Sequence, residues 1–490
     1  MSTFSIWHWF IVLAVVALIF VQRRQRLDTP SGLVGGNYMY SVTKNISAAT
    51  HLGQIDPQLV IDRLEDRHKA RLPEVGLDTQ KLLAEAKTAR MRNGIFAFLL
   101  LIPTIWIISL IFEYHLIDEG EISLEEYIFA YLKPALLIAA LGFVKTIVVN
   151  AYLRKDLVNS QDTPDDLTKH NVIIFGGFSP FAGYGIDLDG WSFTIDTHKP
   201  KIDGVPPLDI DQQDFLNHIS SALATNITDG SIQDKLFVNG LRIRSNRQFL
   251  SDIKATPTTN IEPSAVEAKI GSPEQDARHY RLLSIPLSYG HIFLTFFFRS
   301  SMLGGNLFVE SRSFLLPPIK PELTELIHLP TKRGFPYYSR LFLSKLLLSP
   351  VGWLPGPLYV LSMLGKVQSH IVWALFGHPE DKLKKRTETY NYGHAFSLRE
   401  EWASKTYQTY FQMLDKDMAT KTCQHLIINA IVDYLDTKGI ATDDIKERRT
   451  QIFNSGVIVS GGTVNAQQLA VGAGATVKSK LSGALSSTKR

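Results

Sequence analysis

Residues 170–198 read HNVIIFGGFSPFAGYGIDLDGWSFTIDTH. An apolar run at 172–175 is followed by a glycine-rich turn and then by a segment in which Trp191, Phe193 and Ile195 alternate with polar residues. Alternation with a period of two is typical of a strand that buries one face. The stretch therefore predicts two strands joined by a turn, which begin a mixed α+β domain over residues 168–330.

The rest of that domain follows from the same patterns. An amphipathic helix is predicted at 214–224, and further strands are predicted at 237–243, 280–284, 292–299, 307–310 and 313–316. The predicted fold class of the whole chain is α+β, with a helical transmembrane N-terminal part, the mixed domain, and a helical C-terminal region that carries a short β tail.

The turn 176–185 is the candidate ligand-binding loop. A P-loop needs a lysine where Tyr184 stands, and the dinucleotide fingerprint G-x-G-x-x-G is absent. Two interpretations remain: a tight turn in which glycines permit positive φ and close backbone approach, or a binding loop with an apolar lip. The loop residues concerned are Gly176, Gly177, Phe178, Phe181, Gly183 and Gly185.

Three apolar runs precede the domain. The first, 6–21, is followed rather than preceded by arginines, which favours a membrane anchor over a signal peptide, with a buried soluble helix as the alternative. The second, 95–112, carries no charge, and the third, 127–153, is interrupted by Lys133 and Lys145. Basic clusters at 23–26, 87–92 and 154–155 predict an outside N-terminus and a cytoplasmic location for most of the chain.

The chain divides by composition into eight regions. A fourth apolar stretch, 341–376, contains prolines and lysines, so it is either a hairpin associated with the membrane or a buried helical hairpin. The regions are an anchor (1–22), a cytosolic helical region (23–92), a transmembrane hairpin (93–153), a linker (154–167), the α+β domain (168–330), the hydrophobic hairpin (331–398), a helical region ended by Gly439 (399–440) and a tail (441–490).

Several classes of function are disfavoured. A net charge of +4 over 490 residues gives no electrostatic reason to expect a nucleic-acid partner. The single cysteine, Cys423, cannot form an internal disulfide. His279 and His291 have no predictable acidic partner, so no metal or other cofactor is expected. No catalytic signature is present, and the enzyme question stays open with a leaning toward a non-enzyme.

The tail reads NSGVIVSGGTVNAQQLAVGAGATVK at 454–478. Two arms with small residues on one face are joined by Asn and Gln, with no proline or acidic residue between them, which favours stacked β-structure. We expect either docking on the protein's own body or a neighbouring subunit, or self-association, with a disordered tail as the third alternative. The residues that would carry assembly are Val457, Val459, Val464, Leu469, Val471 and Val477.

Two resemblances accompany these patterns. The GGFSPFAGYG and DGWSF motifs, a late LLPP and the QIFNSGVIVSGG tail are similar to uncharacterised bacterial membrane proteins of actinobacterial type. That resemblance implies a shared fold and a bacterial inner membrane but no activity. The tail also resembles bacterial amyloid-signalling motifs.

Two functions are therefore expected as alternatives. The first is an inner-membrane protein whose cytosolic domain senses or scaffolds and whose tail drives homotypic assembly, one version being a bacterial defence effector. The second is a small-ligand-binding or enzymatic domain tethered to the membrane. In both, the membrane is a partner.

Overall fold

The computed structural model describes residues 41–112, 124–157, 159, 161–166, 170–272, 276–324 and 334–447. The anchor 1–22 and the tail from 448 onward are outside these ranges, and so are all six predicted assembly residues. The described chain forms two compact units. Unit 1 comprises 41–66, 76–165 and 319–388, and unit 2 comprises 67–75, 166–318 and 389–447. Each unit is thus assembled from three separate stretches of the chain.

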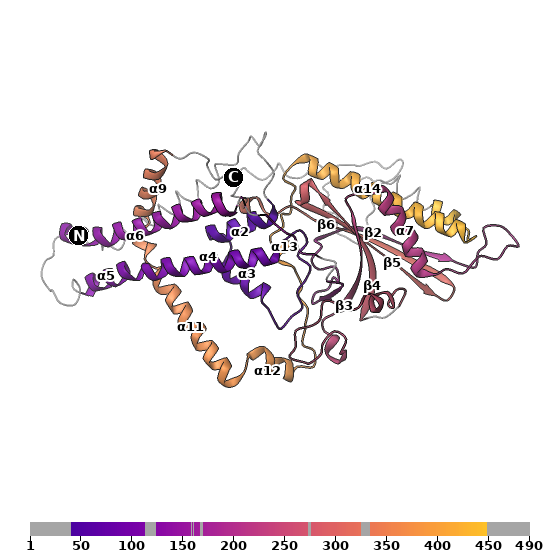
Figure 1. Ribbon diagram of the computed structural model, residues 1–490, viewed down its shortest axis with the longest axis horizontal. Helices are drawn as coiled ribbons and strands as arrows, with labels where there is room; N and C mark the ends of the chain where they lie inside the picture. The colour runs from indigo at the N-terminus through magenta and orange to yellow at the C-terminus, as the bar shows by residue number, and fades with distance from the viewer. Residues whose placement is uncertain are drawn as a thin grey trace, which may run out of the picture. The chain divides into compact units, whose positions relative to one another are not determined.

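Unit 2 is built on a six-stranded sheet of order β1-β3-β4-β5-β6-β2 (Figure 1). Only β1 and β3 pair in parallel, and the other neighbours are antiparallel. The strands are β1 (Val172–Phe175), β2 (Ile186–Asp196), β3 (Ser231–Asn239), β4 (Ala277–Leu287), β5 (Ile292–Leu303) and β6 (Asn306–Leu316). The predicted mixed α+β class is confirmed for this part of the chain.

Two strand predictions need correction. The segments 307–310 and 313–316 form one strand, β6, because residues 311 and 312 keep the same alternation and pair with both neighbours. The strand predicted at 237–243 begins earlier and ends at Asn239. Asn239 is the last paired residue of β3, and the carbonyl of the next residue, Gly240, accepts from the Tyr392 N–H at 3.1 Å.

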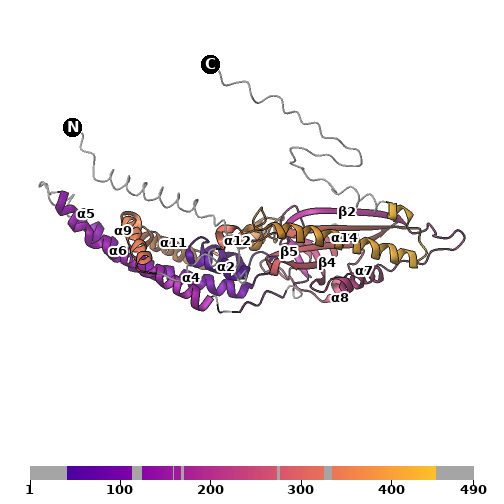
Figure 2. The ribbon, with the colours of Figure 1, turned by 90° about the horizontal axis from the view of Figure 1, so that it is seen from above.

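Two helices cover one face of the sheet. Helices α7 (Gln212–Asn226) and α14 (Tyr410–Thr437) lie side by side there (Figures 1 and 2). Asp211 caps the first, and a reciprocal capping box of Thr409 and Gln412 begins the second. Apolar residues at helical spacing between 427 and 435 predict a buried stripe on α14, and this stripe enters the core. The buried residues of the core include Phe215, Ile219, Phe296, Phe298, Ile427, Ile431 and Leu435.

Extended chain covers the opposite face. The glycine-rich loop 176–185 packs there beside residues 72–75, and Phe181 lies among the aromatic side chains of the sheet. Apolar residues at helical spacing from 56 to 72 predict a single helix there, but α3 spans only Pro57–Leu64. Beyond it the chain joins unit 2, where the Ala70 N–H donates to the Tyr392 carbonyl at 2.7 Å. Tertiary hydrogen bonding therefore replaces the local helical preference.

The remaining elements of unit 2 are short. They include α8 (Pro263–Glu267) and α13 (Leu398–Glu401). The spacing of Tyr407, Phe411, Leu414 and Met418 predicts an apolar helical stripe, but residues 402–409 are not helical, so Tyr407 precedes the cap of α14.

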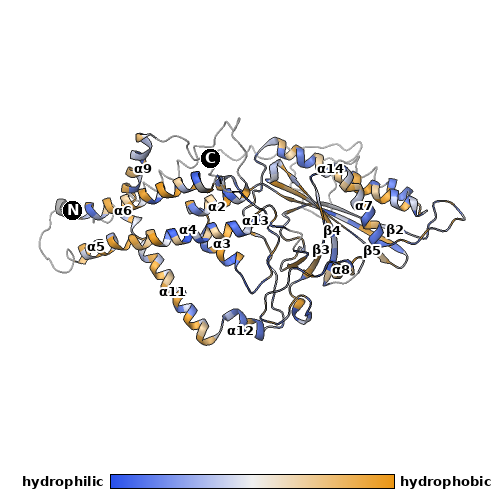
Figure 3. Cartoon of the chain, in the orientation of Figure 1, coloured by the Kyte–Doolittle hydropathy of each residue, from blue (hydrophilic) through white to orange (hydrophobic). Residues whose placement is uncertain are grey.

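Unit 1 is helical and largely apolar (Figure 3). Its helices are α2 (Val42–Leu52), α3, α4 (Thr79–Leu99), α5 (Leu101–Phe112), α6 (Leu124–Tyr152), α9 (Phe335–Leu347), α10 (Ser349–Gly352), α11 (Pro355–Phe376) and α12 (Pro379–Arg386). The spans Thr79–Phe112 and Phe129–Lys155 are long and apolar enough to cross a membrane, and a third candidate is the pair Phe335–Leu347 and Ser349–Phe376, bent by 67°.

Glycines bring α10 and α11, which belong to the bent helix pair, close to the two apolar spans. A Cβ added at Gly94 of α4 would lie 2.6 Å from the Tyr359 hydroxyl of α11, and one added at Gly356 would lie 3.1 Å from the Ala97 carbonyl oxygen. On the other side, Gly352 packs against Ile138 of α6. Small residues at helix crossings are typical of packing within membranes, where backbones approach closely.

Candidate functional site

The start of the predicted ligand loop is fixed by backbone contacts. Gly176 donates its N–H to the His394 carbonyl at 2.9 Å, and its own carbonyl accepts from the Asn391 side-chain amide at 2.8 Å. A Cβ at Gly176 would overlap the carbonyl group of Gly393. Gly177 packs beside Ala395. The interpretation of these glycines as positions of close backbone approach is confirmed.

The end of the loop needs glycine for its backbone angles as well. Gly183 has φ of 99°, and Gly185 has φ of 92°. Gly185 also donates its N–H to the Glu400 carboxylate at 2.8 Å. A side chain at Gly185 would overlap the Leu315 carbonyl group, and a Cβ at Gly183 would lie 2.8 Å from the Pro73 carbonyl oxygen.

The two phenylalanines of the expected apolar lip differ in exposure. Phe178 is fully exposed, whereas Phe181 is only 7% exposed. The Phe181 ring lies 4.6 Å from that of Phe297, 4.8 Å from that of Phe314 and 5.1 Å from that of Tyr280, measured between centroids. Phe181 therefore fills the core, and Phe178 alone is available at the surface. Ligand binding at this loop stays a prediction.

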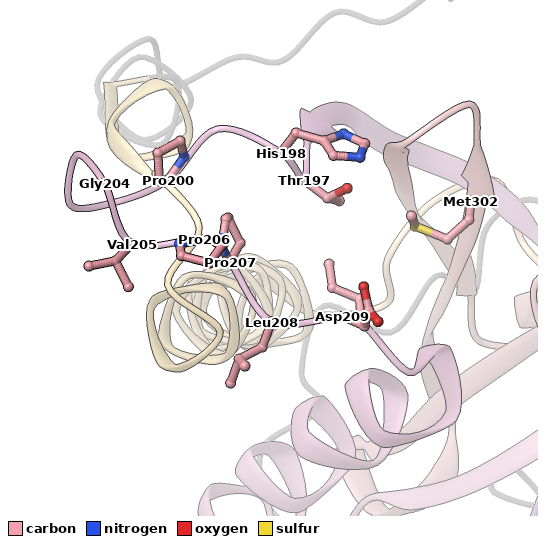
Figure 4. Close-up of a pocket in the computed structure, with 11 residues that line it drawn as sticks. Thr197, His198, Pro200, Gly204, Val205, Pro206, Pro207, Leu208, Asp209 and Met302 are labelled. Carbon is pink, nitrogen blue, oxygen red and sulfur yellow. The ribbon is translucent and has the colours of Figure 1, made fainter.

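A groove lies elsewhere on unit 2, at the loop between β2 and α7. It encloses a cavity of about 610 Å³. Figure 4 shows Thr197 and His198 along one side, with Met302 from the β5 end and Asp209 bordering the same space. The complete lining is mainly apolar and consists of Thr197, His198, Pro200, Gly204, Val205, Pro206, Pro207, Leu208, Asp209, Ile210 and Met302.

The chain that leads into the tail is paired with this same loop. Beyond α14, Gly439 accepts from the Lys201 N–H at 2.8 Å, and Ala441 donates its N–H to the Lys199 carbonyl at 3.0 Å. The Leu208 N–H donates to the Lys438 carbonyl at 2.9 Å. Gly439 has φ of 74°, which confirms the predicted helix end there. We call residues 438–447 the tail root.

Charged side chains reinforce this pairing at Asp436. Its carboxylate lies 3.2 Å from Lys201 Nζ and 3.3 Å from Lys446 Nζ, and it accepts from the Thr442 hydroxyl at 2.6 Å. Burial would raise the pKa of Asp436, but the hydrogen bonds from Thr442, Lys201 and Lys446 hold it below its ordinary value. The tail root is therefore attached to the groove loop by both backbone and side chains.

Local sequence patterns indicate little of this arrangement. A proline pair at 206–207 and the charges between 436 and 447 are local signals of a turn and of a polar surface. The pairing itself joins residues more than 200 positions apart, so no local pattern specifies it.

The two histidines considered as a possible metal pair lie near opposite ends of β4. His279 is near the start of β4 and His291 follows its end. His279 Nε2 instead lies 2.8 Å from the Asp234 carboxylate, which also receives Arg281 Nε at 2.8 Å. Burial opposes ionisation of Asp234, yet the hydrogen bonds from His279 and Arg281 lower its pKa to about 2. Among the described residues, no group of three or more His, Cys, Asp or Glu is placed to hold a metal ion.

Comparison with protein families gives one match. A family model for an AbeC-like domain covers residues 190–465, which is more than half of the chain. The chain belongs to this family. The AbeC-like region includes the groove, α14 and the tail root, and it continues to residue 465 in the tail. The match fits the expected resemblance to an uncharacterised bacterial family. No curated protein and no solved structure matches the chain.

Proposed function

We propose that this chain is a multi-pass protein of the bacterial inner membrane whose AbeC-like domain is a cytosolic scaffold or sensor and whose tail drives self-association. The proposal combines the apolar spans of unit 1 with the attachment of the tail root to unit 2. A bacterial defence effector that gathers its membrane segments through the tail is one version of it.

The surface of unit 1 supports membrane insertion. Only 22% and 28% of the most apolar windows of its two candidate spans are buried within the protein. Large apolar side chains such as Phe98, Ile105, Trp106 and Leu361 are exposed instead. Water would disfavour that much apolar surface, whereas lipid tails would cover it. Basic clusters at 87–92 and 154–155 favour a cytosolic location for unit 2.

The attachment of the tail root carries the functional part of the proposal. Residues 439–441 are hydrogen-bonded to 199–201, so the tail begins at a fixed point on a folded surface. A fixed origin raises the local concentration of the tail beside its own domain and presents it identically in every copy. Its small-faced arms, which have no proline or acidic residue, are suited to stacking between copies.

Fluorescence imaging of the full-length chain in a bacterial membrane tests this proposal. The chain carrying a fluorescent protein is expected to form clusters as expression rises, and Val459→Pro and Val471→Pro are expected to keep it dispersed because proline removes a ladder hydrogen bond. Ser487→Pro, outside the two arms, is the matched control and should still cluster. Dispersed fluorescence of the unaltered chain at high expression would exclude tail-driven assembly.

One observation favours a second function for the domain. The groove cavity of about 610 Å³ is within the size range of small-molecule sites, and its lining is mainly apolar with few polar groups. A small apolar ligand there would contact the loop that holds the tail root. Thermal stabilisation of the full chain by a compound, abolished by Met302→Lys and retained in Leu241→Lys at an exposed position of unit 2, would establish this alternative.

A further inference from the structure

Helices α4 and α6 pack antiparallel, and one hydrogen bond fixes their register. The Tyr152 hydroxyl of α6 donates to the Glu85 carboxylate of α4 at 2.7 Å. Seven residues make about two helical turns and a rise of about 10.5 Å. Because the helices are antiparallel, the residue seven positions after Glu85 faces the residue seven positions before Tyr152, and these two residues are Arg92 and Lys145. Ala89, which lies between the two levels on α4, is fully buried.

A third positive charge joins them from α9. The Lys345 side chain lies against Gly142, its Cδ 3.4 Å from where a Cβ would stand. Gly142 is three residues before Lys145 and so on the same face of α6. The charges of Arg92 and Lys345 both act on Lys145, and all three side chains are partly buried. We call Arg92, Lys145 and Lys345 the cationic cluster.

The protein supplies little compensation for these charges. Arg92 Nη2 donates to the His51 carbonyl at 3.1 Å, but Arg92 Nε is buried with no hydrogen-bond partner. Glu85, whose charge acts on Arg92, is already engaged by His51 and Tyr152. No ion pair of Lys145 or Lys345 occurs within the described ranges. Partly buried like charges repel, and a buried donor without a partner is unfavourable, so the cluster is incomplete on its own.

We propose that the cationic cluster binds a phosphate-class anion, with the headgroup of an anionic phospholipid of the inner leaflet as its source. A phosphate oxygen can accept from the free Arg92 Nε while its charge neutralises the two lysines. Basic pockets between apolar helices on the cytoplasmic side are suited to acidic headgroups, and the methylenes beside Gly142 offer an apolar wall to the acyl chains. This inference rests on the proposed membrane insertion.

Reconstitution of the full chain in lipid nanodiscs tests the site. Thermal midpoints are compared in phosphatidylcholine, in phosphatidylcholine with phosphatidylglycerol, and in phosphatidylcholine with inorganic phosphate in the buffer. Phosphatidylglycerol is expected to raise the midpoint, and Lys145→Gln and Lys345→Gln are expected to lose that rise. Lys133→Gln, on an exposed position of the same helix, is the matched control and should keep it.

The neutral lipid gives an independent measure. In phosphatidylcholine alone, whose headgroup has no net charge, Lys145→Gln should be more stable than the unaltered chain, since it relieves repulsion that no net negative charge compensates. A rise produced by inorganic phosphate as strongly as by phosphatidylglycerol, and lost in the same variants, would support the site with a soluble anion as its ligand. An equal rise in Lys145→Gln and the unaltered chain would overturn the site, as would the absence of any rise with either anion.

Flotation with liposomes separates this inference from the proposed function. A chain that does not float refutes membrane insertion itself. A chain that floats and clusters normally, yet shows no response to either anion, refutes only the anion site.

Discussion

Two glycines with the same backbone strain but different surroundings give the sharpest test of the glycine-rich loop. Gly185 has φ of 92° and no room for a Cβ, whereas Gly204 has φ of 86° and nothing within 4 Å of a Cβ. Gly204→Ala should therefore cost only the left-handed conformation, about 1–2 kcal/mol of unfolding free energy. Gly185→Ala adds an overlap with backbone that costs about 1–3 kcal/mol, for a total of about 2–5 kcal/mol.

Gly176 provides the complementary case. Its φ is outside the left-handed region, and its added Cβ would overlap the carbonyl of Gly393. Gly176→Ala should thus cost the overlap alone, about 1–3 kcal/mol.

Hydrogen exchange of the full chain measures these effects in unit 2 specifically. The slowest amides of the central strands β4 and β5 report the free energy of unfolding of this unit, separately from the helices of unit 1. Equal costs for Gly185→Ala and Gly204→Ala, within about 0.5 kcal/mol, would refute the close approach of the loop to β6. A neutral Gly176→Ala would refute its approach to residues 391–394.

Three further predictions use the same exchange measurement or limited proteolysis. Phe181→Ala should lower the unfolding free energy of unit 2 by about 3–5 kcal/mol, because it empties the aromatic core, while the exposed Phe178→Ala should change it by less than about 0.5 kcal/mol; equal effects would contradict the burial. Asp234→Asn should lower the unfolding free energy by about 2–4 kcal/mol, because it leaves the buried Arg281 without its carboxylate. Since the pKa of Asp234 is depressed to about 2, its contribution to stability should be complete above about pH 4 and disappear as the pH falls toward 2. An unfolding free energy that does not change over that pH interval would count against the pair. Asp436→Asn should speed tryptic cleavage at the tail root near neutral pH, and unchanged cleavage in the variant would show that the backbone pairing suffices. In the unaltered chain, cleavage there by pepsin, which is active in acid, should speed up more than in Asp436→Asn as the pH falls below about 4 through the lowered pKa of the Asp436 carboxylate.

Local patterns predicted much of the fold. Alternation identified β2 and the first part of β6, because burial there follows a period of two, whereas β5 is an apolar run that is buried along almost its whole length. The stripe ending at Leu435 and the glycine after it identified the end of α14. These features depend on neighbours in sequence, which is what periodicity reports.

The features that local patterns missed are those made by distant residues. Nothing in the sequence near Ala70 indicates that it hydrogen-bonds to Tyr392, so the segment was assigned to a helix by its spacing. The pairing of Lys201 with Gly439 is equally non-local. The glycine-rich loop was recognised, but its partners at 391–394 come from a region with no distinctive motif.

Energy transfer between labelled full-length chains in proteoliposomes tests self-association through the tail most directly. Donor and acceptor are placed on separate copies, and transfer is measured as the ratio of protein to lipid rises. Self-association through the tail predicts transfer above that of randomly mixed chains, and a fall to the random level for a chain ending at Glu447, which keeps both units and lacks the tail. The same transfer from the full chain and the shortened one would contradict self-association through the tail.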